Sequence, residues 1–189
     1  AESAANKVVL ALIGAGGRGR GFTRKLAARD DVDIKYVCDA EKPRGEAAAR
    51  DFEQIQGFAP QCVADMRRVF DDKDVHGVVV ATPEQWHGLA TVWACQAGKD
   101  VYCEKPLSYD IRDGRAAVDA VKKSGRIVQV GFQRRQSEAY KQVKEYIAAG
   151  NLGKVRFAKA WESSRQGNIG YPPDTDSPPG VDYDLWLGP

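Results

Sequence analysis

Short apolar runs alternate with longer amphipathic segments along most of the chain. The short runs are rich in β-branched residues and predict six strands, at Lys7–Ile13, Asp33–Cys38, Gln61–Val63, Val75–Ala81, Asp100–Cys103 and Ile127–Val130. Helices are expected between them, over Gly17–Ala28, Pro43–Gln56, Asp65–Phe70, Gln85–Ala97 and Ser108–Ser124. Gly98 and Gly125 follow two of these helices and suit left-handed caps. This alternation indicates an α/β fold with a doubly wound, parallel Rossmann sheet.

The pattern changes after the sixth strand. A further helix is expected over Gln136–Ala149, and residues Lys154–Trp161 alternate in the manner of a half-exposed strand. From Ser164 the chain is rich in glycine and proline, which predicts an irregular loop. We therefore expect residues 1–133 to form the Rossmann domain and residues 134–189 to begin a second α+β domain, most of which is missing.

Composition narrows the class of partner. The 28 basic and 26 acidic side chains leave a net charge of +2, which is not the signature of a protein that binds nucleic acid or an anionic membrane. No apolar stretch approaches the roughly 20 residues that cross a bilayer. The four cysteines form no C-x-x-C pair, and with two histidines they show no zinc-ligand spacing. We expect a soluble chain with a small-molecule partner and no metal; the compartment stays open between the cytoplasm, the default, and export behind a cleaved signal.

A glycine-rich turn follows the first predicted strand directly. It is Gly14-Ala15-Gly16-Gly17-Arg18-Gly19, and a helix is expected to start within it. In a dinucleotide-binding turn the first glycine makes the tight bend, the second lets the backbone approach the pyrophosphate and the third lets the helix pack on the strand. Glycine-rich turns are common, but the strand before this one and the helix after it favour a phosphate site.

An acidic residue strengthens this interpretation. Asp39 ends the second predicted strand and lies 20 residues after Gly19, which matches the roughly 20-residue spacing of the ribose-binding acid. Its carboxylate would accept hydrogen bonds from ribose hydroxyls and repel a 2′-phosphate. NAD is therefore expected over NADP, although Lys42 and Arg44 lie just beyond and could bind a 2′-phosphate instead.

Two proline corners end later strands, on the edge of the sheet where open α/β folds bind ligands. The first contains Thr82, Pro83 and His87, and the second is Glu104-Lys105-Pro106. With the glycine loop, Asp39, the run Gly131-Phe132-Gln133-Arg134-Arg135 and the run from Gly150 to Val155, they make the chain resemble the Gfo/Idh/MocA oxidoreductases, the glucose-fructose oxidoreductase and inositol dehydrogenase type. The resemblance extends from Val8 to about Pro189.

The resemblance implies roles for the corners. Lys105 would be the catalytic residue, reaching the substrate hydroxyl and the nicotinamide, with a solvated surface lysine before a turn as the alternative. Glu104 and Pro106 would shape a turn that could contain a cis peptide bond. Thr82, Pro83 and His87 would line the nicotinamide side, with a purely structural hydrogen bond as the alternative for His87. Gln133 would face the cofactor or substrate, with a structural role as its alternative. The cofactor-binding set is then Gly14, Gly16, Gly17, Arg18, Gly19, Asp39, Thr82, Pro83, His87, Glu104, Lys105 and Gln133.

The resemblance also implies the activity, NAD(P)-dependent hydride transfer on a secondary alcohol of a sugar, cyclitol or related polyol by a homo-oligomer. Members of the family continue into a β-sheet domain that carries a further catalytic histidine. His76 and His87 are the two histidines of this chain, and neither matches that residue. Inactivity of the chain alone, an NAD-dependent glycosidase of the same superfamily and a non-catalytic dinucleotide-binding module therefore remain as alternatives.

Overall fold

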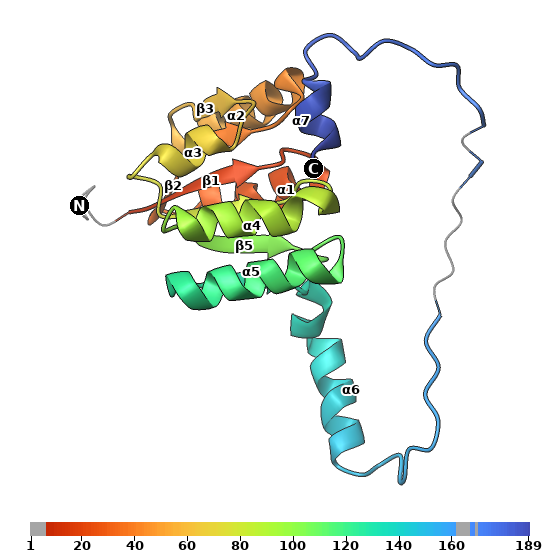
Figure 1. Cartoon of the computed structure of the whole chain (residues 1–189). Coiled ribbons are helices and arrows are strands. Elements are labelled where there is room, and N and C mark those ends of the chain that lie inside the picture. The colour runs from red at the N-terminus through yellow and green to blue at the C-terminus, as the bar shows by residue number, and fades with distance from the viewer. Residues whose placement is uncertain (1–6, 162–166, 169) are drawn as a thin grey trace. The chain divides into compact units, whose positions relative to one another are not determined.

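The computed structural model describes residues 7–161, 167–168 and 170–189. Its centre is a six-stranded parallel sheet in the order β3-β2-β1-β4-β5-β6 (Figure 1). The strands are β1 (Val8–Ile13), β2 (Val32–Cys38), β3 (Gln61–Val63), β4 (Gly77–Val80), β5 (Asp100–Glu104) and β6 (Val128–Gly131). The predicted doubly wound Rossmann sheet is confirmed, and the direction of winding reverses between β1 and β4.

Helices cover both faces of this sheet. They are α1 (Gly17–Ala27), α2 (Lys42–Gln56), α3 (Arg67–Asp71), α4 (His87–Gln96) and α5 (Ile111–Ser124), and a 3-10 turn over Glu84–Trp86 precedes α4. Glycines end two of the predicted helices as expected, since Gly98 and Gly125 have φ of +75° and +66°. Helix α5 starts later than predicted because Asp110 caps it, accepting a hydrogen bond from the Asp113 amide at 2.8 Å.

Alternate residues of the strands feed two separate cores. On β1, Ala11 and Ile13 pack with α3 and α4, whereas Leu12 packs in the cluster that contains α2. All three side chains are buried, because side chains alternate between the two faces of a strand that has helices on both sides. The continuous apolar runs in the sequence therefore reflect burial on both faces.

The chain divides into two units, of which one joins residues up to Gly131 with residues Pro178–Pro189. The latter segment, the C-terminal strap, was predicted to be an irregular loop in a second domain. Instead it contains the short helix α7 (Tyr183–Leu187) and groups with the Rossmann unit. The backbone of the strap is hydrogen-bonded to the turn that leads into α2: Asp182 N donates to Ala40 O, and Lys42 N donates to Gly180 O, both at 2.8 Å.

The other unit spans residues Phe132–Ser177 and contains a 3-10 helix over Gln133–Gln136 and helix α6 (Glu138–Ala148). The predicted strand at Lys154–Trp161 is wrong, because these residues have no strand conformation. Alternation alone does not form a strand, since the backbone groups need a neighbouring strand as partner, and none among the described residues pairs with this segment. None of the helices in the described ranges is long and apolar enough to cross a membrane.

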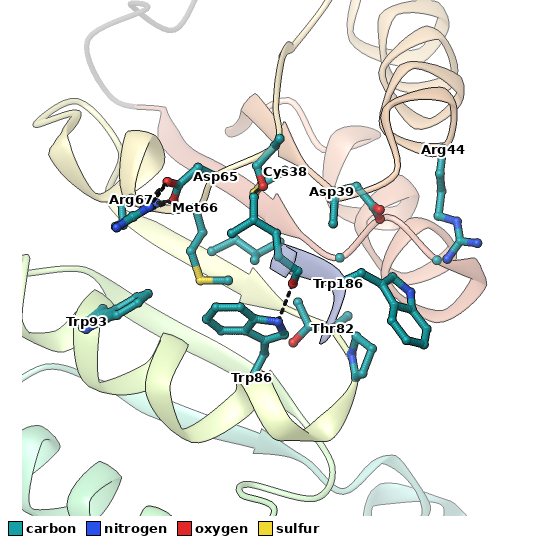
Figure 2. A pocket seen from close by; sticks show the side chains of 18 residues that line it. Cys38, Asp39, Arg44, Asp65, Met66, Arg67, Thr82, Trp86, Trp93 and Trp186 are labelled. Carbon is teal, nitrogen blue, oxygen red and sulfur yellow. Dashed lines mark hydrogen bonds and ion pairs between the residues drawn. The ribbon is translucent and has the colours of Figure 1, made fainter. Parts of the chain in front are cut away.

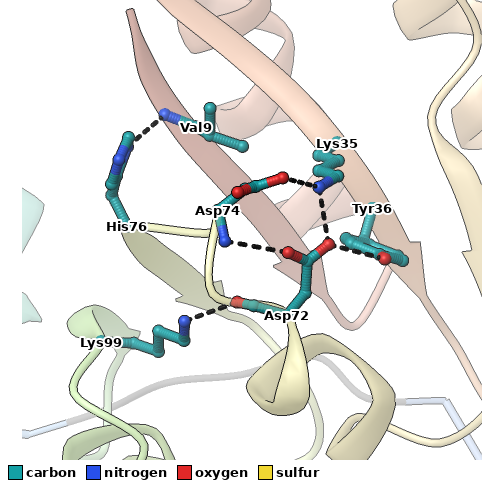
Figure 3. A network of polar contacts seen from close by, with 7 residues as sticks. All are labelled: Val9, Lys35, Tyr36, Asp72, Asp74, His76 and Lys99. Atoms are coloured by element: carbon teal, nitrogen blue, oxygen red, sulfur yellow. Dashed lines mark hydrogen bonds and ion pairs between the residues drawn. The ribbon is translucent and has the colours of Figure 1, made fainter.

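A polar network fixes the loop that leads into β4, at the amino end of the strands (Figure 3). The Asp72 carboxylate accepts hydrogen bonds from Lys35 Nζ at 2.7 Å and from Tyr36 Oη at 2.8 Å. The buried Lys99 donates to the Asp72 backbone carbonyl at 2.6 Å, and Val9 N donates to His76 Nδ1 at 2.9 Å. The hydrogen bond from Lys35 lowers the pKa of Asp72 to about 2. We call this group of residues the amino-edge network.

Candidate functional site

The glycine loop joins β1 to α1 and is held tightly at its first position. Gly14 has a φ of +90°, and a Cβ there would lie 2.6 Å from the backbone of Ala81 and Thr82. At the last position, a Cβ on Gly19 would collide with the Gly14 carbonyl oxygen and crowd Leu12. Both glycines are therefore required by the fold itself, the first for the bend and the last for packing α1 onto β1.

The middle glycines have no such structural reason. Gly16 precedes α1 with an ordinary φ of −63°, and a Cβ there would have Arg44 Nη1, 4.0 Å away, as its nearest neighbour. A Cβ on Gly17 would meet no heavy atom of the described residues within 4 Å. The backbone at the amino end of α1 is thus left open to a ligand, which is the geometry by which helix N-termini receive phosphates.

Asp39 ends the neighbouring strand and contacts the loop. Its Oδ2 accepts a hydrogen bond from Ala15 N at 2.7 Å and its Oδ1 one from Glu41 N at 2.9 Å. A carboxylate has about four lone-pair positions, so each oxygen can still accept a hydrogen bond from a ribose hydroxyl. The structure therefore brings together the loop and the acid that the sequence paired by spacing alone.

A cavity of about 220 Å³ opens beside the loop and Asp39 (Figure 2). It is smaller than the roughly 300–1,000 Å³ of typical small-molecule sites, so it suits one part of a dinucleotide rather than the whole. Its walls come from the ends of β1 to β4, from α2, α3 and α4, from the 3-10 turn before α4, and from α7. The lining residues are Ile13, Gly14, Gly16, Cys38, Asp39, Ala40, Arg44, Ala64, Asp65, Met66, Arg67, Ala81, Thr82, Pro83, Trp86, Trp93, Leu185 and Trp186.

One wall of the cavity was missed in the sequence, namely the strap residues Leu185 and Trp186. Trp86 Nε1 donates to the Leu185 carbonyl at 2.8 Å, a contact drawn in Figure 2. A local signal for the helix was present, because Asp182 caps it by accepting a hydrogen bond from Leu185 N at 3.0 Å. Its docking on Trp86 had no local signal.

In the Thr-Pro corner, Pro83 is exposed and Thr82 half-buried, whereas His87 is buried. Thr82 and Pro83 line the cavity. His87 is 2% exposed, and its ring nitrogens lie 2.5 Å from the Pro106 carbonyl oxygen and 2.9 Å from that of Thr82. His87 thus links the two proline corners through buried contacts with their backbone carbonyls. It does not line the cavity, and these contacts correspond to the structural alternative stated for it above.

The second corner carries Lys105 at the carboxyl end of β5. The Lys105–Pro106 peptide bond is cis, as the sequence resemblance implied. The Lys105 side chain is exposed, and among the described residues no partner hydrogen-bonds or pairs with its ammonium. A free ammonium at this edge can donate a hydrogen bond to a substrate oxygen and stabilise negative charge on it.

Glu104 and Arg18 connect this corner to the glycine loop. Arg18 Nη2 lies 2.6 Å from Glu104 Oε1, and Glu104 Oε2 accepts a longer hydrogen bond from Lys105 N at 3.3 Å. The hydrogen bond to Glu104 raises the pKa of Arg18 further above its usual range. Arg18, expected at the cofactor, is thus engaged by the buried carboxylate, while the last predicted residue, Gln133, lies in the other unit.

Comparison with known proteins places these features in a family. The profile of an oxidoreductase family described as having an NAD-binding Rossmann fold matches residues 8–132. The chain is 36% identical over 129 residues to scyllo-inositol 2-dehydrogenase (NAD(+)) of Bacillus subtilis, a match that covers 67% of this chain and 36% of that protein. It is 35% identical over 121 residues to levoglucosan dehydrogenase of Pseudarthrobacter phenanthrenivorans, covering 64% of this chain and 30% of that one.

The fold has solved counterparts as well. The myo-inositol dehydrogenase of Lactobacillus casei, crystallised with NAD(H) and myo-inositol, superposes with a TM-score of 0.69 at 28% identity. That match covers 78% of this chain and 43% of the other. The chain thus spans less than half the length of each of these three proteins.

Proposed function

The chain belongs to the Gfo/Idh/MocA oxidoreductase family, and on that premise we propose that it is the cofactor-binding part of an NAD-dependent dehydrogenase acting on a secondary alcohol of a cyclitol, sugar or related polyol. The observation that carries the proposal is the opening at Gly16 and Gly17, with Asp39 hydrogen-bonded to the loop beside it through Ala15 N and the Lys105 corner tied to the same loop through the Arg18–Glu104 ion pair. Each of these features suits a different part of the reaction.

The glycine loop would receive the pyrophosphate of NAD, and Asp39 the hydroxyls of the adenosine ribose. The cavity bounded by Trp86 and the strap would take the adenine side, because it adjoins Asp39 and includes residues 64–67 after β3 in its lining. Thr82 and Pro83, expected on the nicotinamide side, would then lie beside the adenosine half of the cofactor. When bound, NAD would accept the hydride that leaves the substrate carbon.

Lys105 would donate a hydrogen bond to the substrate hydroxyl and stabilise the negative charge that develops there when its proton is removed. Neither histidine is placed to assist. His76 Nδ1 accepts from Val9 N at the opposite edge, and both nitrogens of His87 face backbone carbonyls. We therefore propose that this chain by itself binds the cofactor and turns substrate over slowly or not at all.

The binding claim can be tested by titrating the chain with NADH and following the fluorescence of the reduced nicotinamide. Gly16→Ala places a methyl group in the opening without crowding the protein, and we expect a loss of affinity greater than about tenfold with unchanged stability. Gly21→Ala is the matched control, since a Cβ there meets no described heavy atom within 4 Å and the position lies within α1. An unchanged affinity in Gly16→Ala would refute the proposed site.

The reaction class can be tested with a panel of cyclitols and sugars in the presence of NAD. Formation of NADH would support a dehydrogenase, and release of free sugar without net NADH would favour the glycosidase chemistry of the same superfamily. NADH binding with no product from any substrate is the result expected for this chain by itself.

A further inference from the structure

Glu41 lies next to the ribose-binding edge and holds the arginine that faces it. Its Oε2 lies 2.6 Å from Arg44 Nη2, and its backbone amide donates to Asp39 Oδ1 at 2.9 Å. We propose that Glu41 is a specificity residue for the cofactor, because its ion pair with Arg44 withholds that guanidinium from the 2′-phosphate of NADP. The inference rests on the proposed function and extends it to a residue that does not itself line the cavity.

Arg44 is the cation placed to meet a 2′-phosphate. It lines the cavity on the same side as Asp39, whereas Arg67 lies on the far side in a fork with Asp65, with Nη2 and Oδ2 2.5 Å apart (Figure 2). Arg44 Nη1 also lies 4.0 Å from the position of a Cβ on Gly16. A dinucleotide held at Gly16 and Asp39 would therefore carry its adenosine ribose past the Arg44 guanidinium.

The other basic residue of this turn is engaged elsewhere. Lys42 Nζ lies 3.9 Å from Glu46 Oε1, one turn further along α2, and its side chain is 76% exposed. Discrimination thus depends on three neighbouring charges. Asp39 and Glu41 repel a phosphate dianion, and Arg44 would attract it if Glu41 did not neutralise it.

The exposure of the Glu41–Arg44 ion pair to solvent limits its effect on the choice between NAD and NADP. The side chains of Arg44 and Glu41 are 47% and 31% exposed, and exposed ion pairs contribute little. Glu41 therefore biases the choice of cofactor by a modest factor, while Asp39 supplies the remainder through direct contact with the ribose. Once the Glu41 charge is removed, a 2′-phosphate no longer has to compete with a carboxylate for the Arg44 guanidinium.

The test uses the full chain and its affinities for NADH and NADPH. We expect Glu41→Gln to tighten NADPH about fivefold and to change NADH less than about twofold, a factor typical of a partly exposed charge. Glu46→Gln is the matched control, because it removes the same charge from the first turns of α2, the helix that Glu41 precedes, but frees Lys42 rather than Arg44. The ratio of the two affinities should stay unchanged in that variant.

A double-mutant cycle separates the ion pair from net charge. In Glu41→Gln/Arg44→Gln the gain for NADPH should vanish, because the group that binds the phosphate is gone. An unchanged ratio in Glu41→Gln, an equal gain in Glu46→Gln or a gain that persists without Arg44 would each overturn the inference while leaving NADH binding intact. Loss of binding to both cofactors in the unmodified chain would overturn the proposed function together with it.

Discussion

The two ends of the parallel strands differ in how completely their charged groups are paired: Asp39, Arg18 and Glu104 have partners at the carboxyl edge, but Lys105 has none among the described residues. At the amino edge, Asp72, Lys35 and Lys99 all have hydrogen-bond partners within the amino-edge network. At the carboxyl edge, the exposed Lys105 ammonium has no partner in the part of the chain that the structure describes. A charge that is already satisfied contributes to stability, whereas an unpartnered group beside an opening is available to a ligand. Substitutions of the paired charges at the first edge should therefore change unfolding, and substitution of the unpartnered Lys105 at the second should leave unfolding nearly unchanged; the packed glycines of the loop follow their steric surroundings instead.

The largest change in the free energy of unfolding is expected at Gly14, where an added Cβ would lie 2.6 Å from the backbone of Ala81 and Thr82. Gly14→Ala should lower the free energy of unfolding by about 3 kcal/mol, the sum of left-handed strain and overpacking against Ala81. Gly57→Ala is the control, because Gly57 has a similar φ of +86° with no described heavy atom near its Cβ position. Strain alone should cost about 1 kcal/mol there. Equal losses in urea unfolding would show that contact with Ala81 has no effect.

The next effect tests the amino edge. Asp72→Asn should lower the free energy of unfolding by about 2 kcal/mol at neutral pH, since Lys35 and Tyr36 lose a charged acceptor. NADH affinity should be unchanged. Asp74→Asn is the control within the same network, because that side chain is 78% exposed and also pairs with Lys35; it should cost less than about 0.5 kcal/mol. A loss of cofactor affinity in Asp72→Asn would break the division between the two edges.

A smaller effect is expected from pH. Because Lys35 lowers the pKa of Asp72 to about 2 in the folded chain, the ionised carboxylate stabilises the fold above its unfolded pKa of about 3.9. This contribution is lost as the pH falls from about 4 to 2. Urea unfolding at several acidic pH values should show the difference between the unmodified chain and Asp72→Asn shrinking in this window. A constant difference would contradict the assignment.

The smallest effect on stability is expected at Lys105. Lys105→Met removes an exposed ammonium with no partner among the described residues, so the free energy of unfolding should change by less than about 0.5 kcal/mol. NADH affinity should stay close to that of the unmodified chain, while any turnover measured in a longer form of the protein should fall. A large loss of stability would show that the ammonium is part of the fold after all.

The features predicted well from the sequence are those that a short stretch of chain determines. The steric roles of Gly14 and Gly19 follow from a strand, a turn and a helix in direct succession. The roles of His87 and Arg18 depend on the meeting of corners from different strands, 19 and 86 residues apart along the chain. The strand expected over residues 154–161 is absent for a related reason: alternating side chains indicate one half-exposed strand, but they do not identify the neighbouring strand that must pair with it.

The docking of the C-terminal strap also determines when the cavity can form. Its contact between Trp86 and Leu185 joins residues 99 positions apart. During synthesis the chain emerges from the amino end, so all six strands can pair before the strap is made. A ligand stabilises only a state that binds it. A nucleotide that needs the α7 wall can therefore stabilise the fold only after residues 178–189 have been made, and it gives little assistance to a shorter nascent chain.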